Sequence, residues 1–286
     1  MDLKQAVLET LAYSDVFDHP LTLGDLRKFL VAPASQAELQ ACAAGMESVA
    51  YANGFYHLAH RTDILEIRKL REKNSKSAFK RAEFYGRILG RLPFIRMVAM
   101  TGSLAMLNLS KNKDMDYLIV AKAGRVWTAR AFALLFGRLA RMVGDVICPN
   151  VIVSENALAW EAKNLYTARE FAQMIPLSGW GVYRRLLNVN AWVADFLPNA
   201  FSDLDESPRE NSSLLQRLGE SFLNRGLGDA FEKWEMTRKI ARLQAQEGYG
   251  TETNFSAEIC QGNFDHHGTW AMKAFQDRVS SLQVEK

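Results

Sequence analysis

"TGSLAMLNLSKNKDMDYLIV", residues 101–120, is the stretch that decides how this chain is interpreted. An apolar run, "FIRMVAM", ends just before a Gly-Ser pair, a polar interval follows, and Asp114 and Asp116 open a second apolar run. Alternate residues of a β-strand point to the same side, so the pattern predicts two carboxylates on one face of a strand. Like charges this close are costly unless a cation compensates them. The stretch therefore predicts a site and not a plain turn.

The residue types in this stretch suit Mg²⁺ and a phosphate group. Mg²⁺ takes oxygen ligands and is usually held by one or two carboxylates together with substrate phosphates. A glycine permits close backbone approach, a serine offers a hydroxyl and an N–H to a phosphate oxygen, and nearby lysines add positive charge suited to a triphosphate. We predict that Asp114 and Asp116 are metal ligands. The predicted nucleotide-binding residues of this stretch are Gly102, Ser103, Lys111 and Lys113.

Residues 1–60 have the pattern of a small helical module that ends in a hairpin. Apolar residues at helical spacing, an N-cap at Thr22 and a helix start at Ser35 predict three helices. Asn53-Gly54 between two β-prone runs is a strong hairpin signal. This order resembles a winged helix, either a DNA reader or a packing or partner module. The predicted third helix has no Lys or Arg, whereas groove-reading helices use basic or amide side chains. Tight binding of duplex DNA is therefore not expected.

Residues 61–92 form a basic helical connector with ten Lys or Arg against four Asp or Glu. The spacing of the apolar residues predicts one or two helices. A solvated helix face is the usual explanation of such charge, and a phosphate- or RNA-facing surface is the alternative.

Residues 93–155 alternate between strand and helix patterns, with strand candidates at "FIRMVAM", "DMDYLIVAKAG" and "DVICPNVIVSE" and a helix at "RVWTARAFALLFGRLARMV". This order is typical of a small mixed sheet covered by helices. Residues 156–286 are expected to be mainly helical. The predicted fold class is α+β, with a small mixed β-sheet core, an N-terminal winged-helix-like module and a helical C-terminal region.

The spacing of the Gly-Ser and Asp-x-Asp pairs, "MTGSLA…DMDYLIV", resembles the nucleotidyltransferase superfamily, which has the polymerase-β-like fold. Further segments, among them "GRVWTAR", "CPNVIVSE", "MIPLSG" and "CQGNFDHHG", resemble a bacterial group of such proteins with a winged-helix-like front end. The resemblance implies a nucleotidyltransferase core at residues 93–155. It also implies Mg²⁺ on the two aspartates, a nucleoside triphosphate donor, and a substrate hydroxyl that attacks the α-phosphate in line.

The third strand departs from the pattern of this superfamily, in which many members carry a further carboxylate there. Here the central polar residue is Asn150, and the acids Asp145 and Glu155 lie at the two ends. We predict that Asn150 faces the same cleft as the two aspartates and fills the third catalytic position, with a bulge at Pro149 as the feature that would shift the register. An amide is a poor base, so basal turnover should be slow.

Three further polar positions are open to two interpretations each. Arg130 lies one helical turn from Trp127, so the pair either stacks a base and grips a phosphate or packs the helix; we include Arg130 among the predicted nucleotide-binding residues. His266 and His267 lie in a Gly- and Asp-containing segment, where an exposed turn competes with a functional role. One His pair without a nearby Cys is weak evidence for a metal.

The predicted function is Mg²⁺-dependent transfer of a nucleoside monophosphate from a triphosphate to a hydroxyl acceptor. The acceptor stays open between a small molecule, a protein and an RNA end. The alternatives are a catalytically weak nucleotide- or RNA-binding module and a winged-helix DNA-binding regulator. Net charge is +3, too small to indicate nucleic-acid binding by itself. Three widely spaced cysteines and an N-terminus unlike a signal peptide favour the cytoplasm. Arginines interrupt the apolar segment 126–143, which argues against a membrane span.

Overall fold

The computed structural model describes residues 2–110, 114–202, 214–224 and 226–284. Its first part contains three helices and a hairpin, in the predicted order: α1 (Leu3–Asp15), α2 (Leu23–Lys28), α3 (Gln36–Ala44), β1 (Val49–Ala52) and β2 (Phe55–Leu58). The Thr22 side chain accepts a hydrogen bond from the Asp25 N–H, and Ser35 forms a reciprocal capping box with Glu38. Asn53 and Gly54 both have positive φ, 53° and 88°, as a tight hairpin turn requires.

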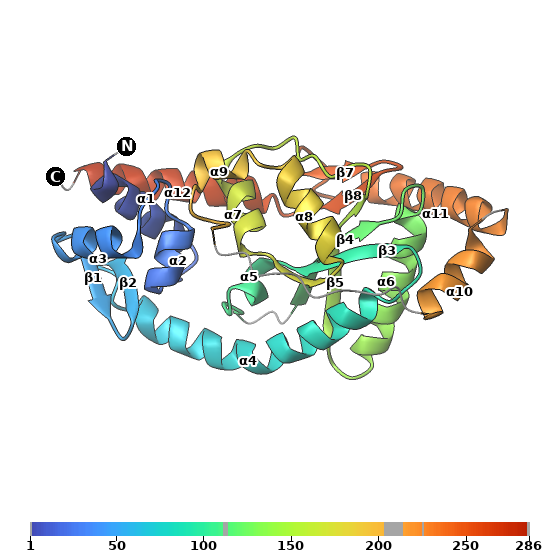
Figure 1. Ribbon diagram of the computed structural model, residues 1–286, viewed down its shortest axis with the longest axis horizontal. Coiled ribbons are helices and arrows are strands. Elements are labelled where there is room, and N and C mark those ends of the chain that lie inside the picture. The colour runs from blue at the N-terminus through green and yellow to red at the C-terminus, as the bar shows by residue number, and fades with distance from the viewer. Residues whose placement is uncertain (1, 111–113, 203–213, 225, 285–286) are drawn as a thin grey trace.

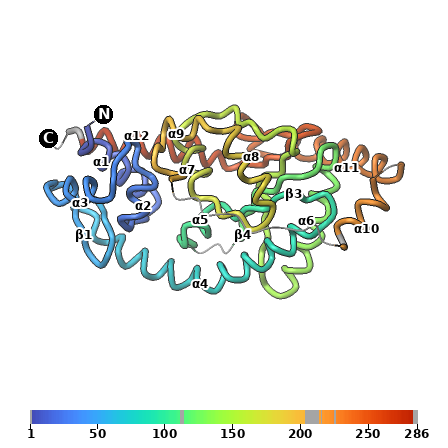
Figure 2. Tube along the Cα trace, in the orientation of Figure 1, coloured from blue at the N-terminus to red at the C-terminus, as the bar shows by residue number. Residues whose placement is uncertain are grey.

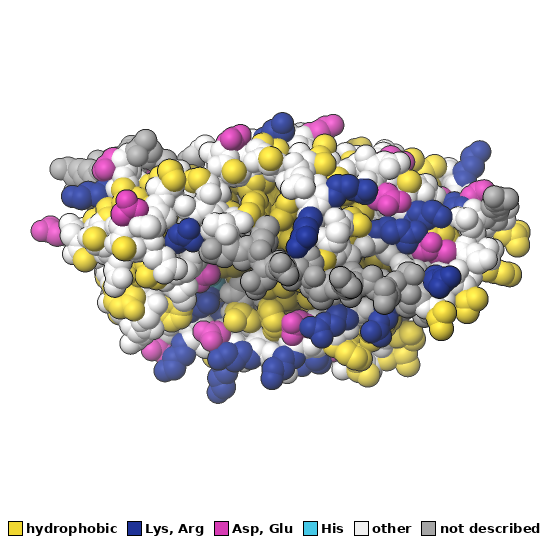
Figure 3. Space-filling view, viewed as in Figure 1, with side chains coloured by type: hydrophobic (Ala, Val, Ile, Leu, Met, Phe, Trp, Pro, Cys, Tyr) yellow, Lys and Arg dark blue, Asp and Glu magenta, His cyan; other side chains and the backbone are white. Residues whose placement is uncertain are grey.

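One continuous helix, α4 (Ile64–Leu89), then runs along the lower side of the molecule from the N-terminal module to the sheet (Figure 1). The sequence left open whether one or two helices occupy this segment, and the structure has one. Ala78 and Ala82 are buried against the sheet, while basic side chains of the outer face are exposed and follow the lower edge in Figure 3. The charge of the connector is therefore largely a solvated helix face.

The sheet has six strands in the order β6-β3-β4-β5-β8-β7. The strands are β3 (Ile95–Met100), β4 (Asp114–Ala121), β5 (Val146–Ser154), β6 (Ile175–Ser178), β7 (Thr253–Phe255) and β8 (Ile259–Gly262). Only β4 and β5 pair in parallel, joined by the crossover helix α6 (Val126–Arg141); the other described pairs are antiparallel. The prediction of a mixed sheet within an α+β fold is confirmed.

The described region after residue 155 is mainly helical, as expected, but three short strands that the sequence did not predict, β6, β7 and β8, return to the sheet. These strands have three or four residues, and Pro176, Asn254 and Gly262 lie within them. Such short runs with weak strand propensity are fixed by pairing with distant strands, which a local pattern does not contain.

The two faces of the sheet carry different helices. Tyr117 and Ile119 of β4 join the core under α4 and α6, whereas Leu118 and Val120 face the opposite core, which includes α7 (Leu165–Gln173), α8 (Trp180–Val189) and α12 (His267–Val284). Asp116 shares the parity of Leu118, so its side chain points toward α7. The remaining described helices are α5 (Gly102–Ala105), α9 (Val193–Phe196), α10 (Leu214–Leu223) and α11 (Leu227–Gln244).

The last helix returns to the first. α12 runs back along the upper side of the molecule and packs on α1 and α7, which places the N- and C-terminal ends of the chain close together (Figures 1 and 2). The rings of Tyr13 and Phe275 lie 5.6 Å apart at this contact. None of the described helices is both long enough and apolar enough to cross a membrane.

Candidate active site

The Gly-Ser pair meets the aspartate strand directly. The Thr101 N–H donates a hydrogen bond of 3.0 Å to the Asp116 carbonyl, so the chain leaves β3 beside Asp116. Gly102 has φ of +65°, a conformation that favours glycine. A methyl group on Gly102 would lie 2.5 Å from Asp116 Oδ2. Both the backbone conformation and the neighbouring carboxylate therefore explain a glycine at this position.

Asp116 is half-buried and lines a cavity of about 320 Å³, which we call the Asp116 cavity. Burial, followed by the charge of Asp114, raises the pKa of the Asp116 carboxyl to about 6. Asp114 itself is exposed at the first position of β4 and is not among the residues that line the cavity. Within the described residues, no Lys or Arg forms an ion pair with either carboxylate.

The neighbouring strand adds an amide and a thiol. Asp116 is opposite Cys148, and the register then shifts so that Tyr117 is opposite Pro149 and Leu118 opposite Val151. Asn150 is the bulged residue and lines the same cavity as Asp116, together with Gly102 and Ser103.

Cys148, interpreted from sequence as a core residue, is half-buried, and its thiol donates a hydrogen bond to the Asp116 carboxylate. Burial, together with the Asp116 charge, raises the pKa of this thiol to about 12, so it is protonated at neutral pH.

The two acids at the ends of the third strand lie elsewhere. Asp145 accepts hydrogen bonds from Arg81 at 3.0 Å and from the Tyr85 hydroxyl at 2.8 Å. Glu155 accepts one from the Ala123 N–H at 3.1 Å. Neither is among the residues that line the Asp116 cavity. Both acids have structural partners, and β5 contributes only an amide to the cavity.

A carboxylate does face the cavity, but it comes from helix α7. Four residues of this helix line the cavity, at intervals of about one helical turn: Tyr166, the adjacent pair Arg169 and Glu170, and Gln173. Glu170 is half-buried and accepts a hydrogen bond of 2.6 Å from Gln173. Burial, followed by the Asp116 charge, raises the pKa of Glu170 to about 7. Sequence reasoning missed this helix, whose signal was a polar stripe on an otherwise apolar, amphipathic segment.

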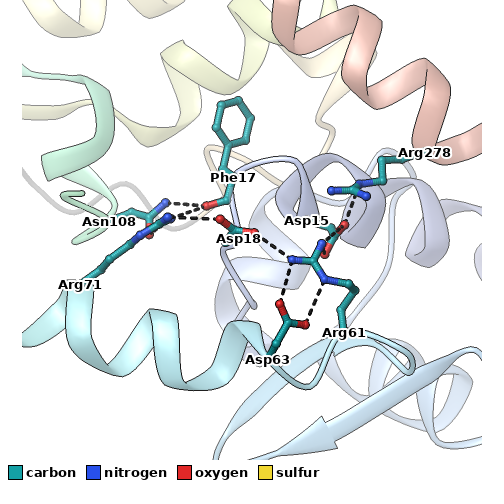
Figure 4. A network of polar contacts seen from close by, with 8 residues as sticks. All are labelled: Asp15, Phe17, Asp18, Arg61, Asp63, Arg71, Asn108 and Arg278. Carbon is teal, nitrogen blue, oxygen red and sulfur yellow. Dashed lines mark hydrogen bonds and ion pairs between the residues drawn. The ribbon is translucent and has the colours of Figure 1, made fainter. Parts of the chain in front are cut away.

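The rest of the wall comes from the N-terminal module, through Tyr13, Ser14, Phe17, His19 and Phe29. Figure 4 shows how the segment after α1 is held in place. Asp15 is buried and pairs with Arg61 at 2.6 Å and Arg278 at 2.7 Å, from the start of α4 and from α12. Arg71 pairs with Asp18 at 3.2 Å.

The Phe17 carbonyl accepts hydrogen bonds from Arg71 at 2.7 Å and from Asn108 at 3.1 Å. Asn108 follows α5, close to the Gly-Ser turn. This network joins the N-terminal module to the sheet edge and to α12, so the module is a fixed wall of the cavity.

A second cavity of about 440 Å³, which we call the Trp160 cavity, adjoins the first. The two share Asn150, Tyr166, Glu170 and His267. The Trp160 cavity lies over Leu118, Val151 and Gln261, which are neighbours across β4, β5 and β8. Its described lining contains apolar, amide and hydroxyl side chains, two glutamates and one histidine, and no Lys or Arg. This composition suits an uncharged or cationic organic group and not a polyanion.

Arg130 lies outside both cavities. It lies over the Trp127 ring at 5.8 Å on α6 and contacts Cys260 of β8. Trp127 is fully buried, and its ring N–H donates to the Ser256 carbonyl at 2.9 Å, so it is not available to stack a base. The pair packs the helix against the sheet. Its predicted role at the nucleotide is not supported by this position.

The other predicted residues have mixed outcomes. Lys111 and Lys113 lie outside the described residues. His267, at the start of α12, lines both cavities, whereas His266 lines neither and has a positive φ of 49°. In the part of the chain that the structure describes, no three His, Cys, Asp or Glu side chains form a group suited to a metal ion.

Comparison with known proteins gave no family model, no curated protein and no solved structure that matches this chain.

Proposed function

We propose that this protein is a Mg²⁺-dependent nucleotidyltransferase that moves a nucleoside monophosphate from a triphosphate to a hydroxyl acceptor. One observation carries the proposal: Gly102, Ser103, Asp116 and Asn150, which were predicted from the sequence and its resemblance to the superfamily, line one cavity. The polymerase-β-like assignment of the sheet and the winged-helix assignment of residues 1–60 belong to the same proposal. The mixed sheet and the element order of three helices and a hairpin are compatible with both.

The two aspartates fit a divalent cation. They occupy alternate positions of β4, burial followed by the charge of Asp114 raises the pKa of Asp116, and no described Lys or Arg pairs with them. Mg²⁺ uses one or two protein carboxylates and completes its shell with water and phosphate oxygens, so a cluster of three protein ligands is not required. When bound, Mg²⁺ would offset the negative charge that develops on the α-phosphate and the leaving pyrophosphate.

In the proposed reaction, different residues of the chain bind the phosphates, position the acceptor and accept its proton. The turn at Gly102 and Ser103 presents backbone and hydroxyl groups to phosphate oxygens next to Asp116. The acceptor occupies the Trp160 cavity, and its hydroxyl reaches the junction where Glu170 and Asn150 line both cavities. The hydroxyl proton passes to Glu170, the acceptor oxygen bonds to the α-phosphorus, and the bond from that phosphorus to pyrophosphate breaks.

We propose Glu170, and not Asn150, as the general base that accepts the proton of the acceptor hydroxyl. An amide accepts no proton at neutral pH, so Asn150 positions a substrate group by hydrogen bonding. The Trp160 cavity contains two glutamates, Glu170 and Glu252. Glu252 caps α12, because it accepts hydrogen bonds from the N–H groups of Gly268 and Thr269. Glu170 has no such capping role and lies where the two cavities meet. A carboxylate with a pKa near 7 is suited to act as a general base.

A catalytically weak nucleotide-binding module is the second candidate, favoured by the amide at the β5 position. Calorimetry with ATP, GTP, CTP and UTP, each with and without Mg²⁺, tests both. Mg²⁺-dependent binding of at least one triphosphate is expected, and it should be lost in Asp116→Asn but retained in Asp195→Asn, an exposed carboxylate of α9 that lines neither cavity. Pyrophosphate release with a mixture of small hydroxyl acceptors separates the enzyme from the binding module. No binding of any triphosphate would refute both.

A further inference from the structure

Arg169 is a buried cation in the wall of the Asp116 cavity. Its residue is only 4% exposed, and its guanidinium lies between the rings of Tyr13, at 4.4 Å, and Phe29, at 4.8 Å. Both rings belong to the N-terminal module, and both line the cavity with Arg169. The charged group is therefore held in one place by contacts from two parts of the fold.

The polar contacts of this guanidinium are weak. It donates to the Ser14 hydroxyl at 3.3 Å and to the Thr10 carbonyl at 3.4 Å, both at the long limit of a hydrogen bond. Nε has no hydrogen-bond partner among the described residues. Glu170, the next residue, directs its carboxylate to Gln173. Within the described part of the chain, no carboxylate forms an ion pair with Arg169.

A buried charge with no counter-ion is expensive for a folded protein. Burial lowers the pKa of the Arg169 guanidinium to about 10, which still leaves it charged at neutral pH. Contact with the Tyr13 and Phe29 rings offsets part of the lost hydration, but an aromatic face is a weak substitute for a carboxylate or phosphate. Such a group is normally retained where a ligand supplies the missing charge.

The surroundings add to the positive field. His19 also lines the cavity but is neutral at neutral pH, because burial followed by the positive charge of Arg68 lowers its pKa to about 3, with Arg71 and Arg169 acting in the same direction. Arg68 is 6% exposed, and its Nε has no hydrogen-bond partner among the described residues but forms an ion pair with Glu72 at 4.0 Å. The carboxylates that face this side, Asp15 and Asp18, are already paired with arginines.

We propose that Arg169, framed by Tyr13, Phe29 and Ser14, forms an anion subsite that binds a phosphate or polyphosphate oxyanion of the substrate. The planar guanidinium of Arg169 lines the cavity and can offer two N–H groups to two oxygens of one phosphate. That the anion belongs to the nucleoside triphosphate rests on the proposed function; the existence of the subsite does not. The N-terminal module is thereby part of the substrate site.

The test uses the full chain in EDTA, so that Mg²⁺ cannot hold the anion. Isothermal calorimetry and thermal shift are measured with chloride, phosphate, pyrophosphate and tripolyphosphate at constant ionic strength. We expect stabilisation that increases along this series, because binding to the folded state alone raises its melting temperature. A wild-type protein that gains no stability from any polyphosphate would overturn the proposal, and this result needs no variant.

Variants then locate the anion. Arg169→Gln should weaken pyrophosphate binding at least about tenfold, Arg169→Lys less, and Arg184→Gln, an exposed arginine of α8, not at all. Asp116→Asn should tighten binding in EDTA, because it removes a negative charge that lines the same cavity. Circular dichroism shows whether each variant is folded. Pyrophosphate affinity that is unchanged in a folded Arg169→Gln protein would contradict the assignment to Arg169.

Comparing the binding of pyrophosphate with the binding of Mg²⁺-triphosphates, in the wild type and in Arg169→Gln, separates this subsite from the proposed function and identifies the source of the anion. Pyrophosphate binding that depends on Arg169, without binding of any Mg²⁺-triphosphate, would retain the subsite and refute the nucleotidyltransferase. Binding of Mg²⁺-triphosphates that ignores Arg169→Gln, while pyrophosphate still requires Arg169, would assign the subsite to an anionic group of the acceptor. Failure of pyrophosphate binding beside intact triphosphate binding would refute the subsite alone.

Discussion

The sheet wall of the Asp116 cavity takes its carboxylate from β4 and its amide from the adjacent strand β5, whereas the helical wall collects its polar groups from three separate parts of the chain. The sheet wall is negative, and burial raises the pKa of Asp116. The helical wall holds the cation of Arg169, which forms no ion pair with any carboxylate in the described part of the chain. Among the described residues, the carboxylate of the sheet wall has no cation paired with it, and the arginine of the helical wall has no anion paired with it. A metal ion and an oxyanion together would compensate both, which is the composition of a metal–polyphosphate substrate.

The largest expected effect is on the sheet wall. Asp116→Asn should reduce nucleotidyl transfer about a thousandfold or more, because it removes a metal ligand at the reacting phosphate. The same change should leave the fold intact and raise the melting temperature in metal-free buffer, since repulsion from Asp114 disappears. Pyrophosphate release and differential scanning calorimetry measure the two effects. Full activity in this variant, with Asp195→Asn as the control, would remove Asp116 from the mechanism.

The helical wall is tested by Glu170→Gln, which keeps the shape and removes the base. Turnover should fall about a hundredfold or more, the range typical of a lost general base, while the dissociation constant for Mg²⁺-triphosphate changes little. The acidic limb of the pH–rate profile, near pH 7 in the wild type, should disappear. Glu161→Gln, an exposed acid outside both cavities, is the control. An unaltered pH profile would assign the proton to another group.

Comparing alanine substitutions at Gly102 and Gly124 separates the effect of backbone strain from the effect of a clash with Asp116. Gly102→Ala should cost about 1–3 kcal/mol of stability through its positive φ and should also displace the Asp116 carboxylate, so Mg²⁺-dependent binding is lost. Gly124 has a similar φ of +69°, but a methyl group there would meet no atom within 4 Å. Gly124→Ala should therefore lose stability and keep binding. Equal binding in both variants, by calorimetry, would mean that Asp116 tolerates the displacement.

The raised pKa values of Asp116 and Glu170 predict that the stability of the fold depends on pH in metal-free buffer. Asp116 and Glu170 have folded-state pKa values of about 6 and about 7, above the ordinary 3.8 and 4.5. A carboxyl with a raised pKa favours the folded state while it is protonated, so its contribution is lost as pH rises from about 4 through these values. Urea titrations from pH 5 to 8 should show the advantage of Asp116→Asn over wild type growing by about 1–3 kcal/mol. A constant difference would contradict the raised pKa.

The smallest effect is expected at Arg130, outside both cavities. Arg130→Ala should change the dissociation constant for Mg²⁺-triphosphate less than about threefold and cost about 1 kcal/mol of stability through its contact with Trp127. Calorimetry and urea unfolding measure these quantities. A tenfold loss of nucleotide affinity would restore the role that the sequence suggested for this arginine.

The same comparison explains which parts of the site could be predicted. Asp114 and Asp116 are two residues apart, and strand alternation alone places them on one face; Gly102 and Asn150 follow from the strands on either side. Glu170, Arg169 and Tyr13 have no such local relation. Their positions depend on how α7 and α1 pack over the sheet, and side-chain chemistry gives no distance across that packing.

The fold divides in a similar way. The three helices and hairpin of the first 60 residues follow from caps and from Asn53-Gly54, which act within a few residues. The strands at 175–178, 253–255 and 259–262 depend on partners far away in the chain. The position of Arg130 could not be read either, because helical spacing places it beside Trp127 but does not say which face of α6 meets the sheet.

The ion pair between Asp15 and Arg278 sets the order in which this cavity can be completed during synthesis. The first residue leaves the ribosome early, and its partner follows only after more than 260 further residues have been added. Until α12 has emerged, the Tyr13 ring lacks its contact with Phe275, and both cavities lack the part of their wall that His267 forms. Proteolytic removal of α12 would therefore take His267 out of both cavities without touching β4, the strand that carries Asp114 and Asp116.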